Sequence, residues 1–174
     1  MSHPVLVGYA TRYGSTREVA EAIATVLRER GLEVDVKPVR GVATLDSYRA
    51  VILGAPLYIG RWHKDATRFA ARHAGALASR PLAIFGLGPL AEGEMEGARA
   101  QFNAVLGGLP SLAPVDAELF GGRYNPDRLR FADRLLASLP ASPLHGVPAR
   151  DARDWEAIDA WARSLAPRLV ADVT

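Results

Sequence analysis

The sequence predicts an α/β fold of three layers, in which helices cover both faces of a doubly wound, five-stranded parallel sheet. Three observations lead to this prediction. Short apolar segments alternate with longer amphipathic segments along the chain. Glycine, proline or hydroxyl residues follow the apolar segments, as expected where strands end. The chain has 174 residues without an evident linker or repeat, so we expect a single domain over residues 1–174.

Three of the five strands fall in the first third of the chain. Residues 4–10 and 50–55 are short and almost uniformly apolar, which is typical of strands buried on both faces. Residues 33–39 alternate between apolar and polar, and Pro38 lacks the N–H of a ladder, so this strand should lie near an edge. Between them, residues 15–30 have apolar side chains at helical spacing and are followed by a glycine, which predicts an amphipathic helix.

The rest of the chain continues the alternation. Residues 126–139 have helical spacing with Pro126 suited to the first turn, whereas residues 140–151 hold too much proline and glycine for regular structure. Asp154 should cap a last helix whose buried face begins with Trp155. The other predicted elements are a helix over 64–77, a strand over 82–88, a helix over 94–106 and a strand over 115–120.

Composition excludes several functions. The absence of cysteine removes disulfides, thiolate metal sites and cysteine nucleophiles, and it fits a reducing cytoplasm. A formal net charge of +2 gives no electrostatic reason to expect a nucleic-acid partner. No apolar run reaches the length of a membrane span, and the histidines lack the spacing of a metal site, so we expect a cytoplasmic protein without a metal.

The segment TRYGST, residues 11–16, follows the first predicted strand and opens the first predicted helix. Unpaired N–H groups at a helix start attract anions, hydroxyl side chains add donors, and a glycine allows close approach of the backbone. This position favours binding of a phosphate monoester. The alternative is a capping box, in which Ser15 and Glu18 only close the helix start.

Two further loops leave the same edge of the predicted sheet. Residues 54–63 contain Tyr58 and Trp62 among small residues, and residues 86–93 contain three glycines. Aromatic side chains and exposed backbone are what a planar aromatic ligand requires. Ordinary packing of Tyr58 and Trp62 remains the alternative for each of them taken singly.

These motifs resemble the flavodoxin-like family, and within it the flavodoxin-domain group that includes menaquinone-dependent protoporphyrinogen IX dehydrogenases. The segment TRYGST is similar to the family's phosphate loop for FMN. The segment YRAVILGAPLYIGRWHKDATRFA, residues 48–70, is similar to the group's flavin-contacting strand, loop and helix. The segments LFGGRYNPDRLRFADRLL (119–136) and RDWEAIDAWARSLAPRL (153–169) are similar to its last strand, insertion and closing helix.

The resemblance implies the flavodoxin strand order and one non-covalently bound FMN. Tyr13 stands where electron carriers usually have a small hydroxyl residue, so it departs from the family pattern within the loop. The phosphate would be held by the loop residues Thr11, Arg12, Tyr13, Gly14, Ser15 and Thr16. The flavin ring would lie between Ala55, Pro56, Leu57 and Tyr58 on one side and Gly86, Leu87 and Gly88 on the other.

The resemblance further implies an oxidoreductase that passes electrons through FMN to a quinone or another redox partner, with a porphyrinogen as candidate substrate. Basic residues in the nearby loops should favour a reduced, anionic flavin; they are Arg12, Arg17, Arg61, His63, Lys64 and Arg123. The catalytic residues are unknown; His63 is a candidate proton donor, although a solvated or packing role is more common. Two alternatives remain, an electron-transfer protein without its own substrate and a flavin-free regulatory module.

A membrane contact is expected to be peripheral at most. The segment RLRFADRLL, residues 128–136, combines basic and apolar residues and would suit the inner face of a membrane, where a quinone lies. We favour the alternative, a helix that packs on the protein's own core.

Overall fold

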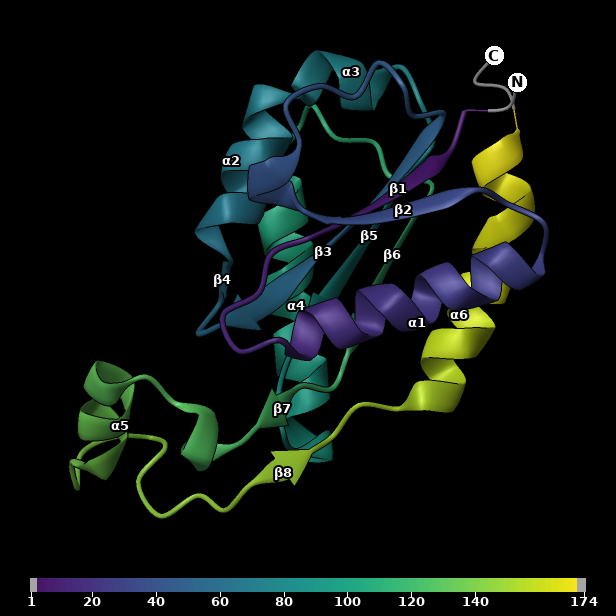
Figure 1. Cartoon of the computed structure of the whole chain (residues 1–174). Helices are drawn as coiled ribbons and strands as arrows, with labels where there is room; N and C mark the ends of the chain where they lie inside the picture. Colours follow the sequence, from purple (N-terminus) through teal and green to yellow (C-terminus); the bar gives the residue numbers. More distant parts are fainter. Residues whose placement is uncertain (1–2, 172–174) are drawn as a thin grey trace.

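The predicted parallel sheet is confirmed (Figure 1). The structure, a computed structural model, describes residues 3–171. Its strands lie in the order β2-β1-β3-β5-β6, and each neighbouring pair is parallel. The strands are β1 (Val5–Tyr9), β2 (Val34–Pro38), β3 (Ala50–Tyr58), β5 (Leu82–Leu87) and β6 (Asp116–Phe120). Pro38 ends β2 at the edge of the sheet, as its missing N–H predicts.

Helices cover both faces of the sheet and complete the three layers (Figure 1). Alternate residues of a strand point to opposite faces, so Val5 and Val7 pack with one helix layer and Leu6 with the other. One layer consists of α1 (Ser15–Glu29) and α6 (Trp155–Val170). The other consists of α2 (Lys64–Arg72), α3 (Ala74–Ala78) and α4 (Met95–Gly107).

The last helix confirms its predicted cap but not the whole of its predicted face. The Asp154 side chain accepts a hydrogen bond from the Ala157 N–H at 3.0 Å, which satisfies one free donor of the first turn of α6. Ile158 and Leu165 are buried as expected. The prediction for Trp155 is wrong, because its ring lies 4.6 Å from the guanidinium carbon of Arg153 and is 43% exposed.

β3 is longer than predicted. The sequence suggests an end near residue 55, but β3 runs to Tyr58 because the chain folds back there into the short antiparallel strand β4 (Arg61–Trp62). The two residues of the turn, Ile59 and Gly60, both have positive φ angles, 47° and 67°. Such a turn matches the twist of a hairpin.

The hairpin also decides the orientation of Trp62. Its indole N–H donates to the Ala55 carbonyl at 3.2 Å, and the ring packs among the core residues between the sheet and the α2–α4 layer. The expectation that Trp62 is displayed by a loop is therefore wrong for this side chain. Tyr58, in contrast, is well exposed.

The predicted helix over 64–77 is divided into α2 and α3 at His73. Phe69 and Leu77 are buried, which confirms the predicted inner face. His73 adopts φ −105° and ψ 17°, outside the helical region, although its N–H still donates to the Phe69 carbonyl at 3.0 Å. The turn redirects the chain toward β5.

The segment between β6 and α6 forms an insertion that leaves the sheet. Its base is a short antiparallel pair, β7 (Arg123–Tyr124) with β8 (Arg150–Asp151). Between them lie a 3₁₀ turn (Pro126–Arg128) and the helix α5 (Phe131–Ser138). The predicted helix over 126–139 is thus shorter than expected, because the backbone of Leu129 and Arg130 is extended. Figure 1 shows α5 apart from the sheet and the other helices.

Candidate functional site

The loop predicted to bind phosphate connects β1 to α1 at the carboxyl edge of the sheet. Within it, the Thr11 hydroxyl oxygen accepts a hydrogen bond from the Gly14 N–H at 2.9 Å, which closes a tight turn. Gly14 has a φ of 87°, a backbone conformation that side chains disfavour, and it directly precedes the first residue of α1. The loop therefore directs the chain sharply into the helix start.

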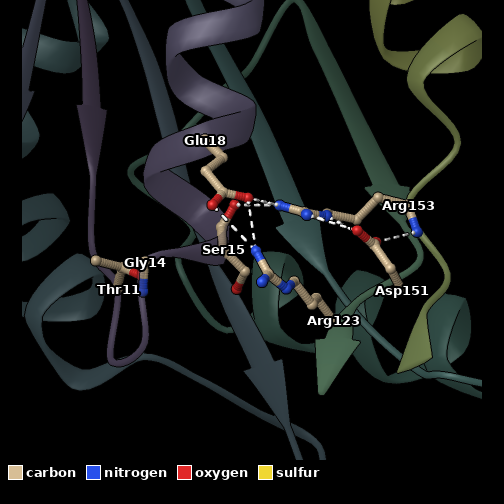
Figure 2. A network of polar contacts seen from close by, with 7 residues as sticks. All are labelled: Thr11, Gly14, Ser15, Glu18, Arg123, Asp151 and Arg153. Carbon is tan, nitrogen blue, oxygen red and sulfur yellow. Dashed lines mark hydrogen bonds and ion pairs between the residues drawn. The ribbon is translucent and has the colours of Figure 1, made fainter. Parts of the chain in front are cut away.

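No side chain within residues 3–171 caps the start of α1. The alternative interpretation of Ser15 and Glu18 as a capping box is wrong, because the Glu18 carboxylate turns away from the helix start. It accepts hydrogen bonds from Arg153 at 2.6 Å and from Arg123 at 3.0 Å, as Figure 2 shows. The donors that a capping box would satisfy are left for another acceptor.

Several polar groups at this helix start have no partner within the described residues. The backbone N–H groups of Ser15, Thr16 and Arg17 donate to no protein acceptor there. The Thr16 hydroxyl is fully buried and is likewise without a hydrogen bond in residues 3–171. A buried hydroxyl without a partner is costly, typically about 1–3 kcal/mol. These donors and the positive end of the α1 dipole fit a phosphate monoester.

Four charged side chains form a network next to the first turn of α1, on the side away from Thr11 and Gly14 (Figure 2). Arg153 contacts both Glu18 and Asp151 at 2.6 Å, and Arg123 adds a second guanidinium to Glu18. Arg153 also donates to the Ser15 carbonyl at 3.2 Å. The side chain of Arg153 is only 3% exposed, so this ion pair is shielded from water on one side. The network joins α1 to the base of the insertion.

The network shifts the pKa values of its members. Partial burial acts to raise the pKa of Glu18, but the hydrogen bonds and charges of Arg153 and Arg123 outweigh it and lower the pKa. The hydrogen bond from Arg153 lowers the pKa of Asp151. Asp151 therefore serves as a second carboxylate partner of Arg153. Arg153 was not singled out by sequence, because nothing local to it indicates a partner at Glu18.

Two predicted phosphate-loop residues contact α5 instead. Nη2 of Arg12 lies 2.6 Å from the Asp133 carboxylate, and the Tyr13 hydroxyl donates to the same carboxylate. The hydrogen bond from Tyr13, together with the charge of Arg12, lowers the pKa of Asp133. Burial, with the bond to Asp133, raises the pKa of Tyr13. Asp133 lies 121 residues beyond Arg12, and no sequence pattern links the two.

The two predicted ring-lining segments are brought together by the sheet. Ala55 lies opposite Gly86 and Pro56 opposite Leu87 in the parallel register of β3 and β5. Ala55, Leu57, Gly86 and Leu87 are buried, Pro56 and Gly88 are partly exposed, and Tyr58 is 62% exposed. The exposed parts of this edge are therefore the Tyr58 ring and the backbone around Pro56 and Gly88.

Glycines hold the β5 loop against the base of the insertion. The Gly88 N–H donates to the Phe120 carbonyl at 2.8 Å. A Cβ at Gly122 would lie 2.3 Å from the Gly88 carbonyl oxygen, and one at Gly121 would lie 2.1 Å from that of Ala152. Only glycine fits at these two positions without movement of the backbone. Gly121 and Gly122 are missing from the residues predicted for the site, although two adjacent glycines directly after a strand are a signal of close approach.

A pocket of about 330 Å³ adjoins the phosphate loop on the side of β2 and α2. Four of its residues are cationic, Arg12, Arg40, Lys64 and Arg130, against the single carboxylate of Asp65, so the pocket is positively charged. Arg40 contacts Asp65 at 2.7 Å. The remaining lining residues are Tyr9, Ala10, Thr11, Pro38, Val39 and His63.

His63 closes the start of α2. Its Nδ1 accepts the Asp65 N–H at 3.2 Å, so this nitrogen is unprotonated. Burial lowers the pKa of His63, and the charges of Arg40, Lys64 and Arg12 lower it further against the opposing effect of Asp65. This arrangement supports the packing role for His63 over the role of proton donor.

Within residues 3–171, no group of three or more histidine, aspartate or glutamate side chains is arranged to hold a metal ion. None of the helices in that range has the length and apolar character needed to cross a membrane.

A parallel sheet of this order, with an uncapped and hydroxyl-rich turn after its first strand, defines the flavodoxin-like class of α/β proteins. The profile of the flavodoxin domain family matches residues 6–146. The chain belongs to this family. Family and fold together indicate FMN as the cofactor.

Known relatives agree with this assignment. The chain is 28% identical over 172 residues to the protoporphyrinogen IX dehydrogenase [quinone] of Escherichia coli K12, covering 92% of this chain and 93% of that protein. Oxidised flavodoxin 2 from Bacillus cereus superposes with a TM-score of 0.61 at 20% identity, covering 95% and 99% of the two chains. A flavodoxin from the domain Archaea gives 0.57 at 15% identity, covering 97% and 99%. The two structural likenesses establish the fold.

Proposed function

We propose that the protein is an FMN-dependent oxidoreductase that takes electrons from an organic substrate and delivers them to a quinone. The relative from Escherichia coli, which aligns over nearly the whole of both chains, is named as a quinone-linked dehydrogenase of protoporphyrinogen IX. A porphyrinogen is therefore the first substrate to test. Bound FMN supplies reversible two-electron chemistry, and the protein supplies binding, orientation and charge.

The uncapped start of α1 is the observation that carries the proposal. Its free N–H groups, the Thr16 hydroxyl and the Gly14 turn would hold the phosphate of FMN. Arg153 donates hydrogen bonds to the Ser15 carbonyl and the Glu18 carboxylate. These bonds hold the first turn of α1 in place and keep Glu18 away from the free N–H groups. Thr11 and Ser15 would complete the loop around the phosphate.

The ring of FMN would lie across the ends of β3 and β5. Ala55, Pro56, Leu57 and Tyr58 approach from one strand and Gly86, Leu87 and Gly88 from the other. The exposed Tyr58 ring is the stacking surface available at this edge. The loop of residues 86–93 contains no aromatic residue and therefore offers no second stacking surface. The side of the flavin ring that faces β5 would stay open to a substrate.

The charges next to the loop favour electron acceptance. Arg40, Lys64 and Arg130 line the adjoining pocket, and positive charge near a flavin stabilises its reduced, anionic form. Arg12 and Arg123 contribute less than the sequence suggests, because Asp133 and Glu18 neutralise them. A quinone acceptor lies in a membrane, so peripheral contact with the inner face of that membrane is part of this proposal.

The test begins with the cofactor. Purified protein should show the absorbance of bound flavin, and HPLC of the released cofactor should identify FMN. Calorimetry of the apoprotein should detect uptake of FMN at micromolar concentrations or below. Colourless protein that takes up no FMN would overturn the proposal and leave a flavin-free regulatory module.

Turnover is the second part of the test. The FMN-loaded protein should oxidise protoporphyrinogen IX, measured by the fluorescence of the porphyrin product, when a menaquinone analogue is the acceptor. Reduction by a partner reductase without porphyrinogen turnover would instead identify an electron-transfer protein without its own substrate.

A further inference from the structure

The most unusual surface of the molecule is on the helix α5, within the insertion. No residue from 125 to 150 is buried, although this stretch holds several large apolar side chains. Phe131 is 83% exposed, and Leu135, Leu136 and Leu139 are each about half exposed. The sequence favours a helix packed on the protein's own core, and that prediction is wrong for α5. Its apolar face is not covered by any described part of the chain.

The orientation of α5 is fixed from the opposite side. Asp133 is held by Arg12 and Tyr13 of the phosphate loop. At 100° per residue, Phe131 and Leu135 lie on a different side of the helix from Asp133, and Leu139 continues their row just past its end. The contact that turns the acidic side chain inward therefore turns the apolar row outward.

Two basic residues accompany this apolar row. Arg128 and Arg134 are exposed, and neither has a carboxylate partner within residues 3–171, although Arg134 donates to the Asp127 carbonyl at 3.2 Å. Arg130, in contrast, lines the pocket beside the phosphate loop and lies on the side of Asp133. Asp133, the only acidic residue of α5, is neutralised by Arg12 and faces the other way. The outward surface thus combines large apolar side chains with two guanidinium groups that no carboxylate of residues 3–171 neutralises. This combination suits an interface that is apolar at depth and anionic at its surface.

We propose that α5 is a docking surface for a membrane with anionic lipid headgroups. Phe131, Leu135 and Leu139 enter the boundary between headgroups and acyl chains, and Arg128 and Arg134 contact the phosphate groups. A second copy of the chain suits the surface less well, because a symmetric pair would bring the same arginines together, while the carboxylate of Asp133 is already held by Arg12. The docked protein presents its phosphate loop, which contacts α5 through Asp133, next to the bilayer.

The inference is tested on the full-length, FMN-loaded protein with vesicles, without any turnover. We expect binding to phosphatidylcholine vesicles that contain phosphatidylglycerol to be at least about tenfold tighter than to phosphatidylcholine alone, and to weaken as salt is added. The inference rests on the proposed function for the membrane contact that a quinone acceptor requires. Since no turnover is measured, a failed porphyrinogen assay does not affect this result. A failed vesicle assay would remove the membrane contact at α5 and leave the FMN-dependent activity to be tested by itself.

Two variants separate the apolar and the charged contributions. Phe131→Ser with Leu135→Ser should weaken binding to the anionic vesicles about tenfold or more, and Arg128→Gln with Arg134→Gln should remove most of the preference for them. These side chains are exposed, so the variants should fold normally, which circular dichroism will check. The matched controls are Val170→Ser and Arg30→Gln, exposed residues on α6 and at the end of α1, which should bind like the wild type.

Three results would overturn the proposal. The first is equal binding to neutral and anionic vesicles, or no binding to either. The second is unchanged binding by the variant with Phe131→Ser and Leu135→Ser. The third is a stable dimer in sedimentation velocity that the same variant dissociates, because α5 would then be covered by a second copy of the chain.

Discussion

The buried hydroxyl of Thr16 is the single group that best reports on the phosphate loop. It lies at the start of α1 without a hydrogen-bond partner in the described residues. The unsatisfied hydroxyl destabilises the protein without a ligand, and a bound anion would satisfy it. Removing the hydroxyl should therefore stabilise the apoprotein and weaken the binding of the anion.

Thr16→Val tests this directly, because valine keeps the shape and removes the hydroxyl. We expect the stability of the apoprotein to be unchanged or higher, and the affinity for FMN to fall by about 1.5–3 kcal/mol, tenfold or more. The affinity for riboflavin, which lacks the phosphate, should stay the same. Thr25→Val, whose hydroxyl bonds within α1 to the Glu21 carbonyl, is the control and should bind FMN normally. Equal loss of riboflavin and FMN binding would contradict the assignment.

Glu18 gives a prediction for the dependence of stability on pH. Its pKa is lowered by Arg153 and Arg123 in the folded protein despite partial burial, and the pKa of Asp151 is lowered as well. A carboxylate whose folded pKa is depressed stabilises the protein above its unfolded pKa, and this contribution disappears as the pH falls through the folded pKa. The free energy of unfolding should therefore decrease as the pH falls below about 4.

Glu18→Gln isolates this contribution, because glutamine keeps the size of the side chain without the charge. The variant should be less stable than the wild type at pH 7 and should lose less stability on acidification, as measured by urea denaturation at a series of pH values. Glu21→Gln, an exposed position on the same helix, should follow the wild type. Parallel curves for Glu18→Gln and the wild type would show that the network adds no pH-dependent stability.

At the scale of elements, the close approach of β3 and β5 depends on one glycine. A Cβ at Gly54 would lie 1.9 Å from Cζ of Phe85, whose ring packs against Trp161 of α6. Gly54→Ala should therefore lower the free energy of unfolding by about 1–3 kcal/mol. Gly75→Ala in α3 is the matched control, since its Cβ meets nothing within 4 Å, and it should be neutral or stabilising by up to about 1 kcal/mol. Equal stability of the two variants in thermal unfolding would contradict this.

The insertion should contribute little to the stability of the sheet. Tyr124 pairs directly with Arg150, so a two-residue Asn-Gly turn in place of residues 125–149 would join β7 and β8 as a hairpin. Because residues 125–150 bury no side chain and the Arg12–Asp133 pair is exposed, we expect a change of no more than about 1 kcal/mol. Thermal unfolding and FMN titration check this, and a shortened chain that fails to fold would contradict it.

At the scale of the whole molecule, charge should set the reduction potential of bound FMN. At an effective dielectric constant near 20, one charge about 8 Å from the ring is worth roughly 2 kcal/mol, or about 90 mV for one electron, and exposure and salt reduce this. Lys64→Gln and Arg130→Gln should each lower the potential by part of that amount. Arg30→Gln, at the end of α1 farthest from the loop, should leave it unchanged. A redox titration of bound FMN in the wild type and the variants measures this effect. A potential that does not fall in Lys64→Gln and Arg130→Gln would contradict the proposed role of the pocket.

The position of the candidate site within the whole molecule could be predicted from the sequence. The sequence predicts that the segments around residues 11–16, 55–58 and 86–88 share one edge of the sheet, and the strand order places all three there. That prediction succeeds because parallel strands must present their carboxyl ends on the same side. Which residues contact FMN stays a prediction, as does the assignment of one domain to residues 1–174.

The sequence by itself determined the succession of strands and helices along the chain, the buried face of α1 and, apart from Trp155, the buried face of α6. Each of these depends on the periodicity of side chains within one segment, which a single element already defines. The tertiary structure alone decided the partners of Glu18 and Asp133, the inward turn of Trp62 and the exposure of α5. The partners Arg153 and Arg12 lie 135 and 121 residues away, and an amphipathic pattern does not specify what its apolar face meets.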